Sequence, residues 1–128
     1  MQDQSSRTIH DAVPAAPTER EVKLATLAHL CGLAASFTPM LATVVPVVIY
    51  LTQREQSEFV AAQAREAVNF QLNMLFLLCA ATILTLVLVG WLMLPILIIG
   101  QIVMAVIAAL EVSQGRSYRY PWIVRIIH

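Results

Sequence analysis

Long uncharged stretches alternate with short charged ones along this chain. No Asp, Glu, Lys or Arg occurs between Lys23 and Arg54, and none occurs between Glu66 and Glu111. A helix that crosses the hydrocarbon core of a bilayer needs about 20 predominantly apolar residues, so the first stretch is long enough for one span and the second for two. Because backbone polar groups find no water in lipid, each stretch should be helical. The pattern predicts an all-α integral membrane protein, a small helical bundle with three apolar segments.

The second uncharged stretch contains one evident turn signal, Gly90-Trp91. We therefore predict one span over about residues 63–89 and another over about residues 93–113. Pro95 then falls in the first turn of the last helix, where a missing backbone N–H is tolerated.

The first apolar segment, about residues 21–52, is too long for one upright span. A straight helix over its roughly thirty uncharged residues would measure about 45 Å, against a hydrocarbon core of about 30 Å. Pro39 breaks the segment, because proline removes a backbone donor and disfavours helical geometry at Thr38 before it. Two interpretations remain: one tilted helix kinked at proline, or a hairpin of short helices over about 21–37 and 40–52. We favour the hairpin.

The basic residues predict the orientation. They fall near the N-terminus, in the 53–66 loop and after residue 113, and none occurs at Gly90-Trp91. Cytoplasmic flanks of membrane spans collect Lys and Arg, so the 53–66 loop and the C-terminus should face the cytoplasm. A hairpin in the first segment would keep the N-terminus there too, whereas a single span would export it. Residues 1–18 have the composition of a disordered tail, which leaves 19–128 as the polytopic membrane domain.

Composition agrees with a membrane protein. The chain is 59% hydrophobic and 12% charged, whereas soluble domains are roughly 45–50% apolar and 25% charged. The expected partner is therefore the lipid bilayer, together with other membrane proteins or further copies of the chain. The formal net charge of zero argues against nucleic acid, whose recognition requires a basic patch.

A few polar residues interrupt the predicted helices. Glu66, Asn69 and Asn73 follow i, i+3, i+7 spacing and so share one helix face, while His29 and Gln101 lie in the first and last apolar segments. Polar side chains within membrane helices usually bond to neighbouring helices. They are candidates for helix packing or, in a second interpretation, for lining a hydrophilic path.

The segment after the last helix combines aromatic and basic residues. Gly115 is suited to the helix C-cap, where a positive φ is needed. The candidates for an interfacial cap are Tyr118, Arg119, Tyr120, Pro121 and Arg125. Tyrosine rings favour the headgroup layer, so the segment could simply anchor the chain at the membrane surface. Alternatively it docks against the 53–66 loop, where the arginines could reach the Glu66 end of the neighbouring helix.

Motifs of catalysis or cofactor binding are missing from the sequence. The two cysteines and three histidines show no metal-ligand spacing, and no glycine-rich phosphate loop or nucleophile elbow occurs. We therefore predict a protein that is not an enzyme and that has no catalytic residues, cofactor or metal.

Several short motifs resemble a known family in the same order along the chain. The most specific are Glu66-Ala67-Val68-Asn69-Phe70-Gln71 and the ending Tyr118-Arg119-Tyr120-Pro121. Over about residues 20–127 the chain resembles the bacterial membrane proteins grouped as domain of unknown function 4870. Those are related to the magnetosome membrane protein MamF and, more distantly, to the twenty-kDa subunit of the chloroplast inner-envelope translocon (Tic). The chain departs from the family pattern at 55–59, which lacks the usual proline.

The resemblance implies a multi-pass protein of the bacterial inner membrane without known enzymatic activity. Two functional hypotheses are compatible with it. In the first, the chain is a non-catalytic subunit or scaffold of a membrane assembly, and its polar residues meet protein and lipid. In the second, it is a small oligomeric channel or transporter component, and its polar residues meet water.

Overall fold

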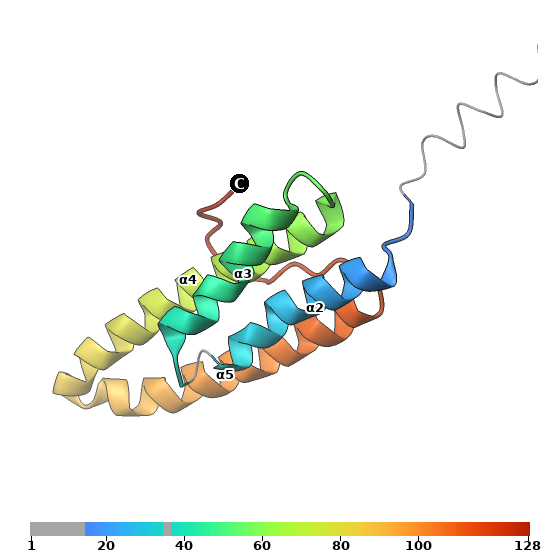
Figure 1. The fold of residues 1–128 in the computed structure, drawn as a ribbon. Helices are drawn as coiled ribbons and strands as arrows, with labels where there is room; N and C mark the ends of the chain where they lie inside the picture. Colours follow the sequence, from blue (N-terminus) through green and yellow to red (C-terminus); the bar gives the residue numbers. More distant parts are fainter. Residues whose placement is uncertain (1–14, 35–36) are drawn as a thin grey trace, which may run out of the picture.

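A computed structural model describes residues 15–34 and 37–128 as an elongated helical bundle (Figure 1). The elements in chain order are α2 (Glu19–Ala34), α3 (Pro39–Gln53), α4 (Glu58–Leu84), the 3-10 turn η1 (Thr85–Val87) and α5 (Val89–Ser113). Within the described ranges there is no strand, so the all-α prediction is confirmed. The predicted disordered tail falls mainly on residues 1–14, which lie outside the described residues.

Side-chain caps determine where α2 and α4 begin. Thr18 and Glu21 form a reciprocal pair, in which the Thr18 N–H donates to the Glu21 carboxylate at 2.7 Å and the Glu21 N–H donates to Thr18 Oγ1 at 3.3 Å. At the start of α4, Ser57 Oγ accepts a hydrogen bond from the N–H of Val60 at 3.3 Å. Each cap satisfies backbone donors that have no partner within the helix.

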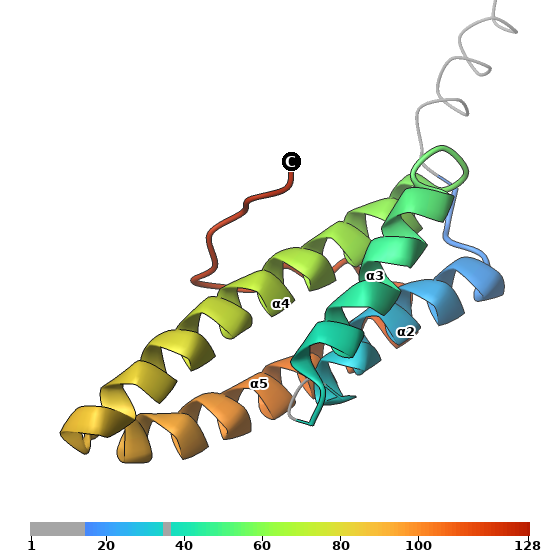
Figure 2. The same cartoon turned by 60° about the vertical axis from the view of Figure 1, so that its left-hand side comes forward.

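The first apolar segment forms two helices, α2 and α3, that run in opposite directions (Figure 2). The interpretation as one kinked helix is therefore wrong. Thr38 has φ −141° and ψ 76°, outside helical geometry, and Pro39 begins α3. With 16 and 15 residues, the two helices measure only about 24 and 22 Å at 1.5 Å per residue. Neither is long enough to cross a core of about 30 Å alone.

The turn between α4 and α5 does not lie at Gly90-Trp91 as predicted. It occupies η1 and Leu88, whose φ of 67° is in the left-handed region, and Gly90 is already inside α5. Pro95 consequently lies within α5 and not in its first turn. An ideal Cβ on Gly90 would overlap the carbonyl oxygen of Ala81, so glycine is needed here for the close approach of two backbones and not for a positive φ.

Small residues allow α2, α3 and α4 to pack closely. Ala28 of α2 and Ala64 and Ala67 of α4 are buried in one cluster with Ile49 of α3 and Val60 of α4. Alanines at a helix interface let the helix axes approach and compensate with van der Waals contact for the absent hydrophobic driving force in lipid.

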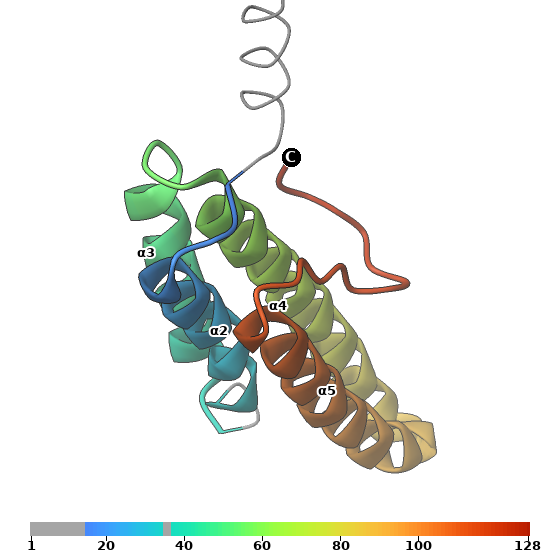
Figure 3. The same cartoon turned by 90° about the vertical axis from the view of Figure 1, so that its right-hand side faces the viewer.

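The described charged side chains gather at one end of the bundle. They belong to the start of α2, the loop after α3, the first third of α4, the last turn of α5 and the residues that follow it. These parts lie together in all three views (Figures 1, 2 and 3). At the opposite end, α4 joins α5 through residues that carry no charge.

The outer ends of α4 and α5 are apolar and exposed. Both helices are long and apolar enough to cross a membrane, and only 17% and 22% of their most apolar windows are buried. Leu86, Leu88 and Trp91 at the tip are 86%, 79% and 69% exposed. The core helix of a soluble protein would bury such side chains, so the exposed apolar surface indicates a membrane location. Two candidate spans are present in the described residues, and the first of the three predicted apolar segments forms the two shorter helices α2 and α3.

Candidate functional site: a polar cap

The chain after α5 turns back and lies along α4, on the side away from α3 (Figure 3). Gly115, with φ of 76°, makes the reversal. The N–H of Gly115 donates to the Val112 carbonyl at 2.9 Å and the N–H of Arg116 donates to the Glu111 carbonyl at 3.3 Å. This is the hydrogen-bond pattern of a Schellman C-cap. We call residues 115–128 the C-terminal segment.

Five polar side chains of the helices meet this segment. They are His29 of α2 and Gln63, Glu66, Asn69 and Asn73 of α4. We call these five side chains together with the C-terminal segment the polar cap.

Glu66 binds the C-terminal segment through both of its oxygens. The N–H of Tyr120 donates to Oε1 at 2.7 Å, and the Arg125 guanidinium donates to Oε1 at 2.8 Å and to Oε2 at 3.3 Å. The side chains of Glu66 and Arg125 are 9% and 29% exposed. A charge-assisted pair in so little water is stronger than a surface ion pair.

Asn69 and Asn73 bind backbone groups of the C-terminal segment. Asn73 exchanges two hydrogen bonds with Val124, accepting from its N–H at 3.0 Å and donating to its carbonyl at 2.7 Å. Asn69 accepts from the N–H groups of Ile126 and Ile127 at 3.1 and 2.9 Å and donates to the Ile127 carbonyl at 3.0 Å. The two amides thus satisfy an extended backbone much as a neighbouring strand would.

His29 connects α2 to the cap. Its Nε2 lies 3.1 Å from Gln63 Oε1, and its Nδ1 lies 3.1 Å from the hydroxyl of Tyr120. Gln63 Oε1 also accepts the N–H of Tyr118 at 3.2 Å, so this atom acts as an acceptor. It follows that a neutral His29 carries its hydrogen on Nε2 and accepts from Tyr120 through Nδ1.

Aromatic packing holds Tyr120 in place. Its ring stacks on Phe70 with centroids 3.9 Å apart and planes 8° apart, and Tyr118 meets it edge-on at 5.1 Å. Tyr120 is 2% exposed. Burial raises the pKa of Tyr120, because the phenolate would lose its hydration, and it raises the pKa of Tyr118 in the same direction.

The predicted site residues therefore do not all assemble. The polar cap brings together residues that were predicted as two separate sets. The helix residues are His29, Glu66, Asn69 and Asn73, and the C-terminal residues are Tyr118, Tyr120 and Arg125. Arg119 and Pro121 are exposed at the surface. Gln101 lies apart from the cap, where it donates to the Gly32 carbonyl at 3.0 Å and joins α5 to α2.

Gln63 is a member of the cap that the sequence analysis missed. It is 3% exposed and bonds both His29 and Tyr118. Its position three residues before Glu66 places it on the polar face already identified, so extending that face by one turn would have found it.

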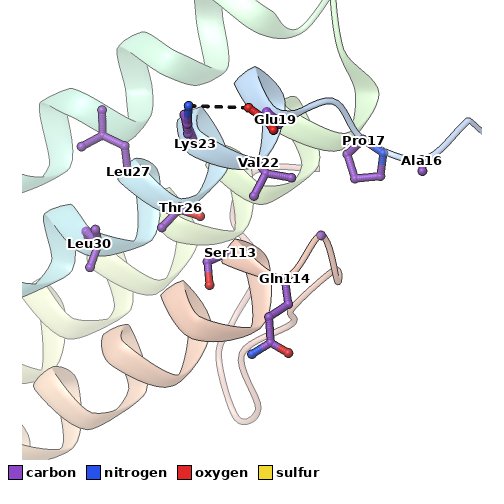
Figure 4. A pocket seen from close by; sticks show the side chains of 11 residues that line it. Ala16, Pro17, Glu19, Val22, Lys23, Thr26, Leu27, Leu30, Ser113 and Gln114 are labelled. Atoms are coloured by element: carbon purple, nitrogen blue, oxygen red, sulfur yellow. Dashed lines mark ion pairs between the residues drawn. The ribbon is translucent and has the colours of Figure 1, made fainter.

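Three hollows border the charged end of the bundle, and two of them lie beside the end of α5 and the C-terminal segment. A groove of about 860 Å³ runs between α2 and the end of α5, with Leu27 and Leu30 on its apolar side and the Lys23–Glu19 ion pair, 3.9 Å, at its rim (Figure 4). A more polar cavity of about 470 Å³ lies between α4 and the C-terminal segment.

Comparison with protein families gives one match. The model of the Magnetosome magnetite crystal formation protein family matches residues 20–127, nearly the whole chain. Neither a curated protein nor a solved structure matched. The match confirms the MamF-like part of the resemblance, while the links to domain of unknown function 4870 and to the chloroplast subunit stay predictions.

Proposed function

The chain belongs to the Magnetosome magnetite crystal formation protein family, and from this membership we propose that it is a non-catalytic subunit or scaffold of a bacterial membrane assembly. In this proposal α4 and α5 cross the inner membrane, while α2 and α3 enter it from the cytoplasmic side and return. The polar cap then lies at the cytoplasmic boundary of the membrane, where partner proteins can reach its outer residues.

The observation that supports this arrangement most is the separation of charge along the bundle. The described Arg and Lys residues at the start of α2, in the loop after α3 and after α5 share one end, and the α4–α5 turn has no charge. Under the positive-inside rule, the charged end faces the cytoplasm. The short hairpin of α2 and α3 brings the N-terminal basic residues to that same side.

The bonding of the buried polar groups favours a scaffold over a channel or transporter component. His29, Gln63 and Asn69 direct their polar atoms at protein partners. A conducting path requires polar atoms that face water along its length. Side chains already bonded to the C-terminal segment serve to hold that segment.

Cysteine labelling in cells tests the orientation. In a background with Cys31→Ala and Cys79→Ala, single cysteines are introduced at Gln56, Trp91 and Arg116. An impermeant reagent added to spheroplasts should label position 91 and leave positions 56 and 116 unlabelled until the membrane is permeabilised. Labelling of 116 but not of 91 in intact spheroplasts would reverse the proposed orientation.

Purification in a gentle detergent tests the scaffold role. Mass spectrometry of the tagged chain should find a membrane protein, or further copies of the chain, in a fixed ratio. The matched control is an unrelated two-span protein with the same tag and expression level. A chain that elutes alone, and that conducts ions or solutes when reconstituted in liposomes, would support the channel hypothesis instead.

A further inference from the structure

The cavity between α4 and the C-terminal segment has a basic lining. Its lining includes Arg65, Arg119 and Arg125, with the Ser117 hydroxyl nearby and Glu66 as the one acidic side chain. Because Glu66 is paired with Arg125 at 2.8 Å, one carboxylate offsets one guanidinium, and the other two arginine side chains of the lining have no paired side-chain carboxylate.

Arg65 and Arg119 carry charges that no carboxylate of the described residues pairs with. None of the ion pairs between described residues involves either of them, whereas Arg54, Arg116 and Arg125 each face a carboxylate. Arg65 is half-buried and Arg119 is exposed. Two guanidiniums at one cavity that have no internal anion repel each other, an arrangement that an external anion would stabilise.

From this cluster we propose that the cavity binds a phosphate group, which Arg65 and Arg119 contact directly while Arg125 stays paired with Glu66. The guanidinium fork matches the oxygens of a phosphate and can bind two of them at once. A volume of about 470 Å³ lies within the ~300–1,000 Å³ usual for small-molecule sites. The phosphate comes either free from solution or on an anionic lipid, since basic pockets beside membrane helices accept lipid headgroups.

The test uses the full chain purified in a non-ionic detergent. Native mass spectrometry compares binding of phosphatidic acid with binding of diacylglycerol of the same acyl chains, which differs only by lacking the phosphate. Inorganic phosphate is tested separately, as a shift in the unfolding temperature against chloride at equal ionic strength. Binding of the lipid alone assigns the headgroup as the source, and a shift with inorganic phosphate assigns a free anion.

The variants are Arg65→Gln and Arg119→Gln, with Arg20→Gln as the matched control. Arg20 is exposed at the same end but outside the cavity, so Arg20→Gln removes the same charge without changing the cavity lining. Loss of one charge-assisted contact should weaken phosphate binding about tenfold, while Arg20→Gln should leave it unchanged. All three variants should unfold at the wild-type temperature without ligand, which excludes misfolding as the cause.

Three outcomes would overturn the proposal. Equal binding of diacylglycerol and phosphatidic acid, with no shift by inorganic phosphate, would show that acyl chains and not phosphate are recognised. Equal weakening by Arg20→Gln would show diffuse attraction to the charged end. No response to either phosphate source would show that the cavity is not an anion site. None of these results depends on the orientation in the membrane, so a failure of the labelling experiment above is a separate finding.

Discussion

Replacing Gly90 by alanine should destabilise the turn between α4 and α5. The first turn of α5 passes so close to the end of α4 that an ideal Cβ at position 90 would overlap the Ala81 carbonyl oxygen and the Thr85 nitrogen, and would lie 2.7 Å from the Leu84 carbonyl carbon. All three are backbone atoms. No side-chain rotation can relieve the overlap, so the two helices must move apart or the turn must rearrange.

The size of the effect follows from two opposing contributions. Alanine gains about 1 kcal/mol over glycine within a helix. Overpacking that displaces backbone typically costs about 1–3 kcal/mol and occasionally more, and the overlap here involves atoms that cannot yield. With a cost at the upper end, about 3 kcal/mol, we expect Gly90→Ala to lower the free energy of unfolding by roughly 2 kcal/mol in net terms.

Gly100→Ala is the matched control on the same helix. An ideal Cβ at Gly100 meets no atom within 4 Å, so this variant should be neutral or gain up to about 1 kcal/mol. The assay is reversible unfolding in mixed micelles with increasing sodium dodecyl sulfate, followed by circular dichroism. If Gly90→Ala unfolds at the same detergent fraction as Gly100→Ala, or at a higher one, the close approach of the helices is not a constraint on stability.

Three further predictions concern the polar cap. Tyr120→Phe should lower the free energy of unfolding by about 1 kcal/mol, because it removes one buried hydrogen bond. Burial raises the pKa of Tyr120 above its ordinary 10.0, so the stability of the wild-type protein should be constant below that pH and fall above it. The variant should show a smaller fall. Arg125→Gln should cost about 2–3 kcal/mol by leaving Glu66 without its partner, and adding Glu66→Gln should recover part of that loss in thermal unfolding. Asn69→Leu with Asn73→Leu should release the C-terminal segment, so trypsin should cleave it faster while the helices keep their circular dichroism; unchanged cleavage would contradict this role.

The helices themselves could be predicted because charge and proline are strong local signals. The absence of charge over 24–53 and 67–110 located the apolar segments. The break before Pro39 followed from backbone geometry that proline imposes wherever it occurs. These signals act within a few residues and do not require knowledge of what packs nearby.

The turn between α4 and α5 was misplaced because glycine has two physical uses. Gly90 was predicted to reverse the chain, but the positive φ belongs to Leu88, and Gly90 allows a close backbone contact two residues later. A leucine in the left-handed region costs roughly 1 kcal/mol or more. Tertiary packing of the two helices offsets this cost, and packing of that kind leaves no local mark in the sequence.

The partner of the polar face was also beyond local signals. Asn69 and Asn73 were expected to face other helices, yet they bond backbone groups of Val124, Ile126 and Ile127. Backbone N–H and C=O groups are the same in every residue, so a side chain that binds them specifies no partner sequence. By contrast, the pairing of Glu66 with an arginine of the C-terminal segment was one of the two predicted arrangements of that segment, because a carboxylate and a guanidinium can be matched from their charges alone.

The depth of the C-terminal segment explains why amides are needed at these positions. If the α4–α5 turn marks the far surface of the membrane, a core of about 30 Å extends back along α4 by about 20 residues, which reaches the level of Val68. Val124, bonded to Asn73, then lies about one turn of helix inside that boundary. Extended backbone at this depth has no water to bond and would cost several kcal/mol for each unsatisfied group. Asn69 and Asn73 supply those bonds, which lets the segment stay extended where lipid alone would not permit it.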